Sequence, residues 1–139
     1  MSSVIVSSGA VISGSTSDYE SENNVSQSDT WNIKKGGTTV DQISWGTRIV
    51  ESGGVMLNPY TSKDSNDHLK ADAYTSGGSI YRGGRRYISS GASSVEFSVK
   101  DNGTASILDG GYVSGARIAG NGHPWQDEVG RIVVETAGS

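Results

Sequence analysis

The chain alternates between short apolar segments and short polar segments that end in glycine. Residues 4–6 (Val-Ile-Val) run into residues 7–9 (Ser-Ser-Gly), and residues 47–50 (Thr-Arg-Ile-Val) run into residues 51–54 (Glu-Ser-Gly-Gly). Glycine after a polar residue supplies the positive φ angle that a tight turn needs. Because the apolar segments are short and rich in β-branched residues, the pattern predicts strands joined by tight turns.

Apolar and polar residues also alternate within the predicted strands. The alternation is clearest in residues 95–100, where Val95, Phe97 and Val99 are placed on one face and the residues between them on the other. No segment keeps a 3.6-residue period over about eleven positions, so almost no helix is expected.

The spacing of the turns distinguishes two all-β architectures. A sandwich joins antiparallel strands by hairpins, whereas a solenoid bends at quasi-periodic corners and winds on. Gly77, Gly84 and Gly91 follow one another at steps of seven residues, and Gly103 and Gly110 repeat that step. The repetition favours an all-β parallel β-helix, or β-solenoid, in a single domain over residues 1–139. Rungs of about 20 residues would number six or seven and stack into a rod roughly 30 Å long.

Two segments lack strand patterning. Residues 15–30 are polar and acidic, and residues 56–72 contain Asn58-Pro59-Tyr60 followed by a polar run. Both are expected to be loops that protrude from the rungs, which is the usual position of recognition residues on a rigid scaffold. Solvated insertions without a partner are the alternative interpretation.

Composition excludes several classes of function. The 139 residues contain no cysteine, which excludes disulfide scaffolds, cysteine-ligated zinc, iron–sulfur clusters and thiol nucleophiles. The formal net charge of −4 argues against a general nucleic-acid or anionic-membrane binder, although a local basic patch is compatible with it. The first residues have no basic segment followed by a long apolar one. We therefore expect the protein either to stay in the cytoplasm or to be exported by a route whose signal is absent from this chain.

Several of the strand-and-turn segments share a recognisable pattern. They are VIVSSGAVISG (residues 4–14), GGTTV (36–40), RIVESGGV (48–55), YISSGA (87–92) and NGTAS (102–106). Recurring in this order, they resemble the repeats of bacterial autotransporter passengers, the AIDA-type strand-loop-strand family. The resemblance implies a right-handed β-helix or roll that is usually part of a surface adhesin.

The first candidate contact site is a basic and aromatic segment. Arginine guanidinium groups beside aromatic rings are suited to binding a phosphate, a single-stranded nucleic acid or an acidic protein surface. A solvated corner, built around the turn at residues 83–84, is the structural alternative. The candidate residues of this segment are Tyr81, Arg82, Arg85, Arg86 and Tyr87.

The second predicted loop adds Tyr60, Asp64, Asp67 and His68 as candidate contact residues. The last three are of types that ligate metals, but no second histidine and no cysteine is placed to complete a tetrahedral zinc site. The Gly-Gly-x-Gly-x-Asp repeat of calcium-binding β-rolls is absent, as are the phosphate- and dinucleotide-binding glycine motifs. We therefore expect neither a metal nor a cofactor.

Catalytic chemistry has few candidates. No Gly-x-Ser-x-Gly motif is present, and the histidines are His68 and His123. Paired carboxylates are typical of glycan-cleaving enzymes. The acidic residues from which such a pair would come are Asp101, Asp109, Asp127 and Glu128. We expect no catalysis, and a small glycan-active enzyme is the alternative.

The ends of a solenoid carry unpaired backbone groups that invite association. Trp31, Trp45 and Trp125 are candidates for plugs at the ends or for residues of an interface. Either the predicted loops cap the ends or two chains join there, and a homodimer is the favoured interpretation.

Together these features predict a non-catalytic binding protein. It would present loops and an arginine-rich corner to a protein or surface-glycan partner, as an adhesin passenger does. Besides the glycan-active enzyme, one further alternative stays open. The protein would be an intracellular inhibitor that is encoded by a phage or mobile element and that, like an anti-CRISPR protein, binds a host nucleoprotein complex. Nucleic acid is expected as a partner only within such a nucleoprotein, and no apolar run is long enough to span a membrane.

Overall fold

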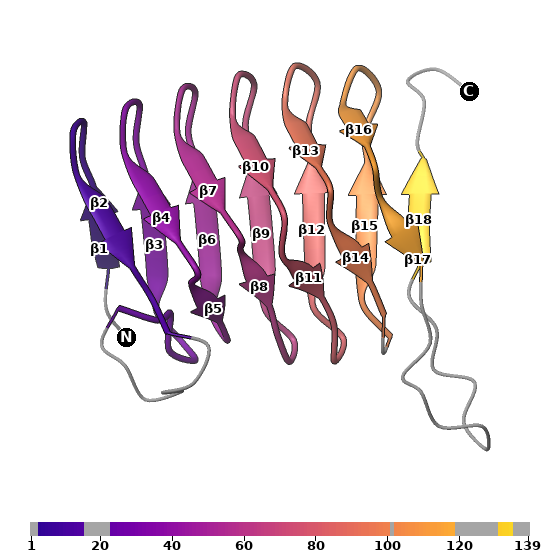
Figure 1. The fold of residues 1–139 in the computed structure, drawn as a ribbon, viewed down its shortest axis with the longest axis horizontal. Helices are drawn as coiled ribbons and strands as arrows, with labels where there is room; N and C mark the ends of the chain where they lie inside the picture. The colour runs from indigo at the N-terminus through magenta and orange to yellow at the C-terminus, as the bar shows by residue number, and fades with distance from the viewer. Residues whose placement is uncertain (1–2, 16–22, 101, 119–130, 135–139) are drawn as a thin grey trace.

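The chain winds repeatedly through the same three strand directions, and equivalent strands of successive turns pair in parallel (Figure 1). A computed structural model describes residues 3–15, 23–100, 102–118 and 131–134. Within these residues the regular structure is all β and no helix is present, so nothing described is a helix long and apolar enough to cross a membrane. The predicted β-solenoid is confirmed, and about five of its turns contribute a strand to all three sheets, whereas six or seven turns were expected.

Three parallel sheets form the sides of the solenoid. Sheet A contains, in spatial order, β1 (Ser3–Val6), β3 (Thr30–Ile33), β6 (Thr47–Val50), β9 (Asn66–Leu69), β12 (Arg85–Ile88), β15 (Thr104–Ile107) and β18 (Arg131–Val134). Sheet B contains β2 (Val11–Ser13), β4 (Thr38–Val40), β7 (Val55–Leu57), β10 (Tyr74–Ser76), β13 (Ser93–Val95) and β16 (Tyr112–Ser114). Sheet C contains β5 (Ile43–Ser44), β8 (Tyr60–Thr61), β11 (Ser79–Ile80), β14 (Ser98–Val99) and β17 (Arg117–Ile118).

The register of sheet A gives the length of a turn. Thr47, Asn66, Arg85 and Thr104 are paired in succession, so these turns have 19 residues each, close to the expected 20. Thr30 pairs with Thr47, which makes the preceding turn two residues shorter. The turns at residues 3–30 and 104–131 are longer by comparison, because Ser3 pairs with Thr30 and Thr104 with Arg131.

The segment expected to be the second loop, residues 56–72, is a regular part of the solenoid. It contains most of β7 and all of β8 and β9. The prediction was wrong because two residues that point into the core here, Thr61 and Asp67, are polar, and polar inward residues hide the alternation of a strand.

The segment expected to be the first loop, residues 15–30, is described only in part. Residues 16–22 lie outside the described residues. Val25 forms a parallel bridge with Ser44 beside sheet C, and β3 already begins at Thr30. The described residues of this segment therefore rejoin the solenoid before the next turn begins.

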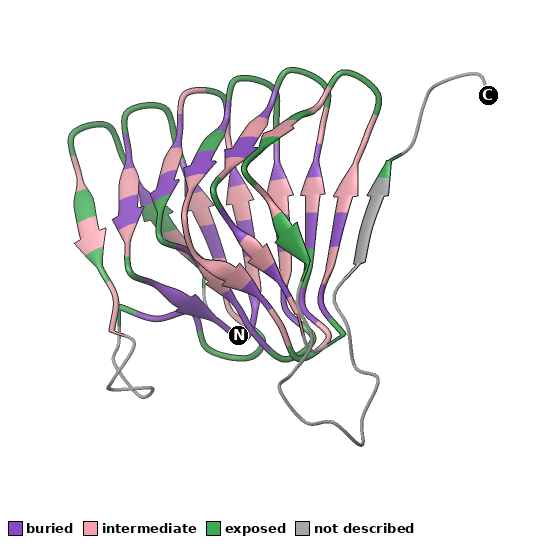
Figure 2. Ribbon diagram, turned by 45° about the vertical axis from the view of Figure 1, so that its right-hand side comes forward, coloured by how far each residue is buried: buried purple, intermediate pink, exposed green. Residues whose placement is uncertain are grey.

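Buried residues occur in the strands of all three sheets (Figure 2), and their side chains fill the interior. In sheet A, one row of aliphatic residues in successive turns is fully buried, and sheets B and C contribute residues such as Met56, Ile80 and Val99. Each turn can bury its apolar side chains only against its neighbours, so this stacking stabilises the fold. The aliphatic row of sheet A is Val6, Ile33, Val50, Leu69 and Ile88.

Residues 95–100 do not form one alternating strand. Val95 ends β13 on the outer face of sheet B, whereas Phe97 and Val99 are buried. Between them Glu96 has a φ of 55° and forms the bend from sheet B to sheet C. The prediction that Val95 shares a face with Phe97 and Val99 was therefore wrong, because a bend interrupts the alternation.

Gly78 lies just after the same bend in the preceding turn and has a φ of +80°. A Cβ atom there would lie 1.9 Å from the carbonyl oxygen of Pro59. Because the obstacle is backbone, we expect Gly78→Ala to lower the free energy of unfolding by about 2–3 kcal/mol, measured by urea denaturation. Gly9→Ala is the matched control, since Gly9 has a φ of +84° but no atom within 4 Å. We expect Gly9→Ala to lower the free energy of unfolding by only about 1 kcal/mol, and an equal decrease in the two variants would contradict the steric explanation.

Candidate functional site

The predicted contact residues do not form one surface. Asp67 and Arg86 lie inside the solenoid and are fully buried. The expectation that they contact a partner is therefore wrong, because the alternation of β9 and β12 points both side chains inward. The other predicted residues reach the surface at three places. Tyr60 lies on sheet C, Asp64, Tyr81 and Arg82 lie at the corners between sheets C and A, and His68, Arg85 and Tyr87 lie on the outer face of sheet A.

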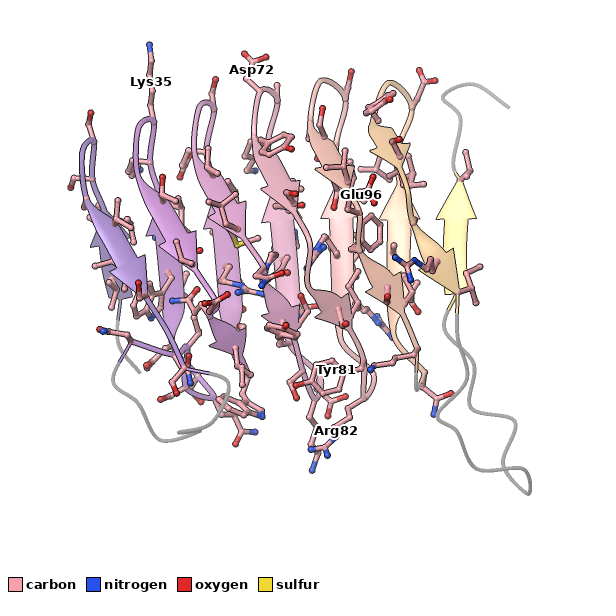
Figure 3. All side chains as sticks on the ribbon, viewed as in Figure 1. Lys35, Asp72, Tyr81, Arg82 and Glu96 are labelled. Carbon is pink, nitrogen blue, oxygen red and sulfur yellow. The ribbon has the colours of Figure 1, made fainter. Side chains whose placement is uncertain are left out.

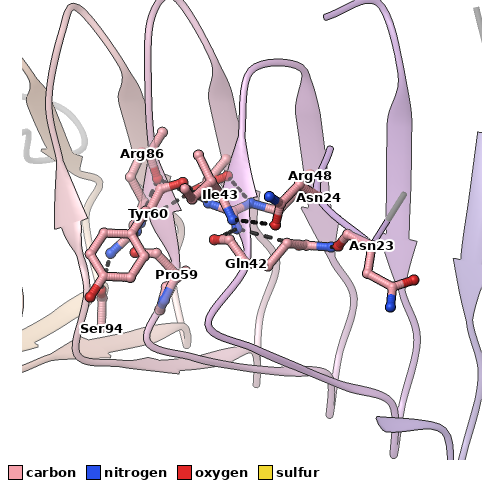
Figure 4. A network of polar contacts seen from close by, with 11 residues as sticks. Asn23, Asn24, Gln42, Ile43, Arg48, Pro59, Tyr60, Arg86 and Ser94 are labelled. Carbon is pink, nitrogen blue, oxygen red and sulfur yellow. Dashed lines mark hydrogen bonds and ion pairs between the residues drawn. The ribbon is translucent and has the colours of Figure 1, made fainter. Parts of the chain in front are cut away.

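Asp67 and Arg86 belong to a buried polar network that also contains Arg48 (Figure 4). The three residues occupy equivalent positions of β9, β12 and β6. Nε and Nη2 of Arg48 donate to the two carboxylate oxygens of Asp67 at 2.7 and 3.0 Å, and Nε of Arg86 donates to Oδ2 of Asp67 at 3.2 Å. One carboxylate thus bridges two guanidinium groups.

Thr61 closes the network from sheet C. Its hydroxyl accepts hydrogen bonds from Arg48 at 3.1 Å and from Arg86 at 3.0 Å, and it donates to Oδ2 of Asp67. Further guanidinium donors are satisfied by oxygen atoms of the surrounding turns, and the Arg86 guanidinium also lies over the Phe97 ring at 5.3 Å from its centroid. The additional acceptors are the carbonyl oxygens of Gln42, Pro59 and Tyr60 and the side chains of Gln42 and Ser94.

The pKa values of the network follow from burial and from these contacts. Burial alone would raise the pKa of Asp67, but the charges of Arg48 and Arg86, with hydrogen bonds from Arg48 and Thr61, outweigh burial and hold it below its ordinary value. Burial lowers the pKa of Arg86 to about 10, and the Asp67 carboxylate opposes that change. Asp67 is therefore ionised at neutral pH.

The network is structural, since none of its three charged side chains is exposed to a partner. Buried ion pairs contribute little net stability because their desolvation is costly, and their best-attested use is to specify which elements lie side by side. Sequence reasoning missed Arg48. The signal that identifies it is the 19-residue spacing of Arg48, Asp67 and Arg86, each two positions before a buried aliphatic residue.

Two of the three places at which predicted residues reach the surface adjoin at the corner between β11 and β12, and we call the exposed and half-buried side chains around it the corner surface. The turn at residues 81–84 carries the Arg82 guanidinium over the Tyr81 ring at 5.8 Å from its centroid (Figure 3). On the adjoining outer face of sheet A, the His68 and Tyr87 rings stack with centroids 5.0 Å apart and planes 9° apart. Arg85 and Asn66, paired in the same two strands, complete this block. The corner surface consists of Asp64, Asn66, His68, Tyr81, Arg82, Arg85 and Tyr87.

The corner surface is rigid and carries exposed cations. Its strands are paired on both sides in sheet A, and the turn is closed by a hydrogen bond from the Gly84 amide to the Tyr81 carbonyl at 2.9 Å. Arg82 and Arg85 are exposed, and within the described residues neither makes an ion pair. Such guanidinium groups beside aromatic rings suit an anionic partner.

The three residues considered as metal ligands do not converge. Asp67 points into the core, His68 points out of sheet A, and Asp64 lies at the corner. Across the part of the chain that the structure describes, no group of three His, Asp or Glu side chains is placed to hold a metal ion.

The other predicted residues fall at separate places. Of the four candidate catalytic acids, Asp109 is exposed in the turn between β15 and β16, and Asp101, Asp127 and Glu128 lie outside the described residues. Trp31 is buried in the core and Trp45 is half-buried, while Trp125 and His123 also lie outside the described residues.

Comparison with known proteins adds a structural likeness. No family model and no curated protein matches the sequence. Among solved structures the chain is similar to the TibC-catalysed, hyper-glycosylated TibA55-350 fragment, with a TM-score of 0.46 and 19% sequence identity over 97% of this chain. This chain spans 56% of the chain in that structure. The β-solenoid is the kind of fold implied by the resemblance to autotransporter passenger repeats, and the function is inferred below from this chain's own residues.

Proposed function

We propose that the protein is a non-catalytic binding protein whose corner surface contacts an acidic protein or acidic glycan. The observation that carries the proposal is the pair of exposed arginines, Arg82 and Arg85, set beside three aromatic rings on a rigid sheet. Guanidinium groups bind carboxylates through paired hydrogen bonds, and the rings add stacking area at little conformational cost.

The charge around the corner supports an anionic partner. Lys63 is exposed at the equivalent corner of the preceding turn, so this region carries three exposed cations, Lys63, Arg82 and Arg85, and one exposed carboxylate, that of Asp64. The whole chain is acidic, with a formal net charge of −4, and this local basic surface therefore favours one orientation of an acidic partner over others.

Retention on immobilised polyanions tests the proposal. We expect polygalacturonate or polyglutamate to retain the protein at low salt, and Arg82→Ala/Arg85→Ala to weaken the affinity about tenfold, since each exposed ionic contact contributes up to about 1 kcal/mol. Lys35→Ala/Arg117→Ala is the matched control, because it removes the same charge from two exposed residues outside the corner surface.

Three results would contradict the proposal. They are failure of both polyanions to retain the protein at about 50 mM salt, equal weakening in the two double variants, and release of new reducing ends from polygalacturonate. The last result would indicate the glycan-active enzyme.

A further inference from the structure

The outer face of sheet B differs from the corner surface in having no charge. None of the residues in its six strands is Asp, Glu, Lys, Arg or His. Parallel sheets are normally covered on both faces, yet large apolar side chains are exposed here. They include Val11, Leu57, Tyr74 and Tyr112, with exposed fractions from 39% to 64%.

Two tyrosines and a serine form a straight row on this face. Tyr74 pairs with Ser93 and Ser93 with Tyr112, so the rings stand on β10 and β16 with a hydroxyl on β13 between them. Two strand spacings separate the rings by roughly 9–10 Å, which is close to the length of a disaccharide unit. The neighbouring row offers the hydroxyls of Ser76 and Ser114 on either side of Val95.

We infer that the outer face of sheet B binds an extended, uncharged, β-1,4-linked polysaccharide that lies across the strands along the solenoid axis. The apolar C–H faces of sugar rings stack on aromatic rings, and the hydroxyls around them need short polar partners such as serine. The row runs across the strands, so two sugars that are one disaccharide unit apart in the polysaccharide would meet Tyr74 and Tyr112.

The border of the face supplies stronger acceptors for sugar hydroxyls. The carboxylates of Asp41 and Glu96 are exposed at the bends between sheets B and C, where the two residues have φ values of 52° and 55°. A Cβ atom at Gly115 would lie 2.5 Å from Oε1 of Glu96, so this side chain extends over the next turn toward β16 (Figure 3). A carboxylate only accepts hydrogen bonds, which fits a ligand rich in hydroxyl donors.

Other occupants fit the face less well. An acidic chain would find no cation in these strands, and so it belongs at the corner surface. A second copy would need about 20–30 residues on each side for a stable interface, whereas the six strands of sheet B present only two outward residues each, 12 in all.

Isothermal titration calorimetry of the full chain with cellohexaose and chitohexaose tests the inference. We expect one of the two to bind, Tyr74→Ala and Tyr112→Ala each to weaken the affinity about tenfold, and Tyr74→Phe to retain it, because the ring rather than the hydroxyl makes the contact. Ser93→Lys should abolish binding by placing a charge between the rings, and it does so without removing either ring. Tyr60→Ala, on sheet C, is the matched control and should bind as the wild type does.

Four outcomes would overturn the inference. The first is that neither hexasaccharide binds at millimolar concentration. The second and third are that Tyr60→Ala weakens the affinity as much as the tyrosine variants of sheet B do, and that Ser93→Lys leaves the affinity unchanged. The fourth is that the protein is a dimer that dissociates when Tyr74 is replaced by alanine. None of them bears on the corner surface, which is tested with anionic ligands and with arginine variants. The experiments can therefore contradict the polysaccharide site on sheet B without contradicting the proposed function of the corner surface, and the reverse.

Discussion

Replacing Asp67 by alanine will lower the free energy of unfolding by about 3–5 kcal/mol. The change removes the carboxylate that bridges Arg48 and Arg86 and leaves two guanidinium groups fully buried in the core. Urea denaturation followed by circular dichroism measures the loss. Asp109→Ala is the matched control, because Asp109 is exposed and does not have a positive φ, and we expect it to change the free energy of unfolding by less than about 0.5 kcal/mol.

A combined variant separates the cost of unpaired charge from the value of the network. Arg48→Met/Asp67→Leu/Arg86→Met replaces all three buried charges with apolar side chains. The attraction within a buried ion pair exceeds the cost of desolvating its charges by little, if at all. We therefore expect this variant to be about as stable as the wild type, or up to about 4 kcal/mol more stable. A loss as large as that of Asp67→Ala would show that the network itself stabilises the fold.

The same carboxylate predicts how stability changes with acid. The pKa of Asp67 is lowered in the folded protein, so its contribution is fully present above the ordinary value of 3.8 and is lost as pH falls through the lowered folded pKa. We expect the free energy of unfolding of the wild type to fall more steeply below pH 3.8 than that of the combined variant. Parallel curves would contradict the assigned pKa shift.

The repeating architecture was predictable because its signals are local. Glycine-ended turns and short β-branched segments specify where the chain bends, and the expected rung of about 20 residues is close to the observed 19. Turns without glycine follow the same geometry. Asp72 has a φ of 66° at a corner where Gly53 and Gly91 stand in neighbouring turns, because aspartate tolerates the left-handed region.

The polar interior was not predictable from alternation alone. Arg86 sits among exposed basic and aromatic residues in the sequence, and only its register opposite Asp67 shows that it points inward. The stacked pair of His68 and Tyr87 likewise depends on register, since the two residues are 19 positions apart. Both features become visible once the repeat length is known and the turns are aligned, because the partners in each pair are one turn apart.

Phe97 occupies a core position whose neighbours are small. Counting back one residue from the paired strands of sheet C places Gly78 in the turn before it and Ala116 in the turn after it. The bulky ring is therefore accommodated by its small neighbours, and it is almost fully buried beside the Arg86 guanidinium.

Replacing Phe97 by alanine is accordingly expected to lower the free energy of unfolding by about 3–5 kcal/mol. Neither Gly78 nor Ala116 has a side chain that can move into the space left by the ring, so the cavity persists and the loss lies toward the upper end. Phe97→Leu, which refills most of that volume, should cost no more than about 1.5 kcal/mol in the same urea titration. Val95→Ala, on the outer face two residues away, should cost least of the three. If Phe97→Leu proved as damaging as Phe97→Ala, contact between the ring and Arg86 would be the main contribution, and filling of the core would be the lesser one.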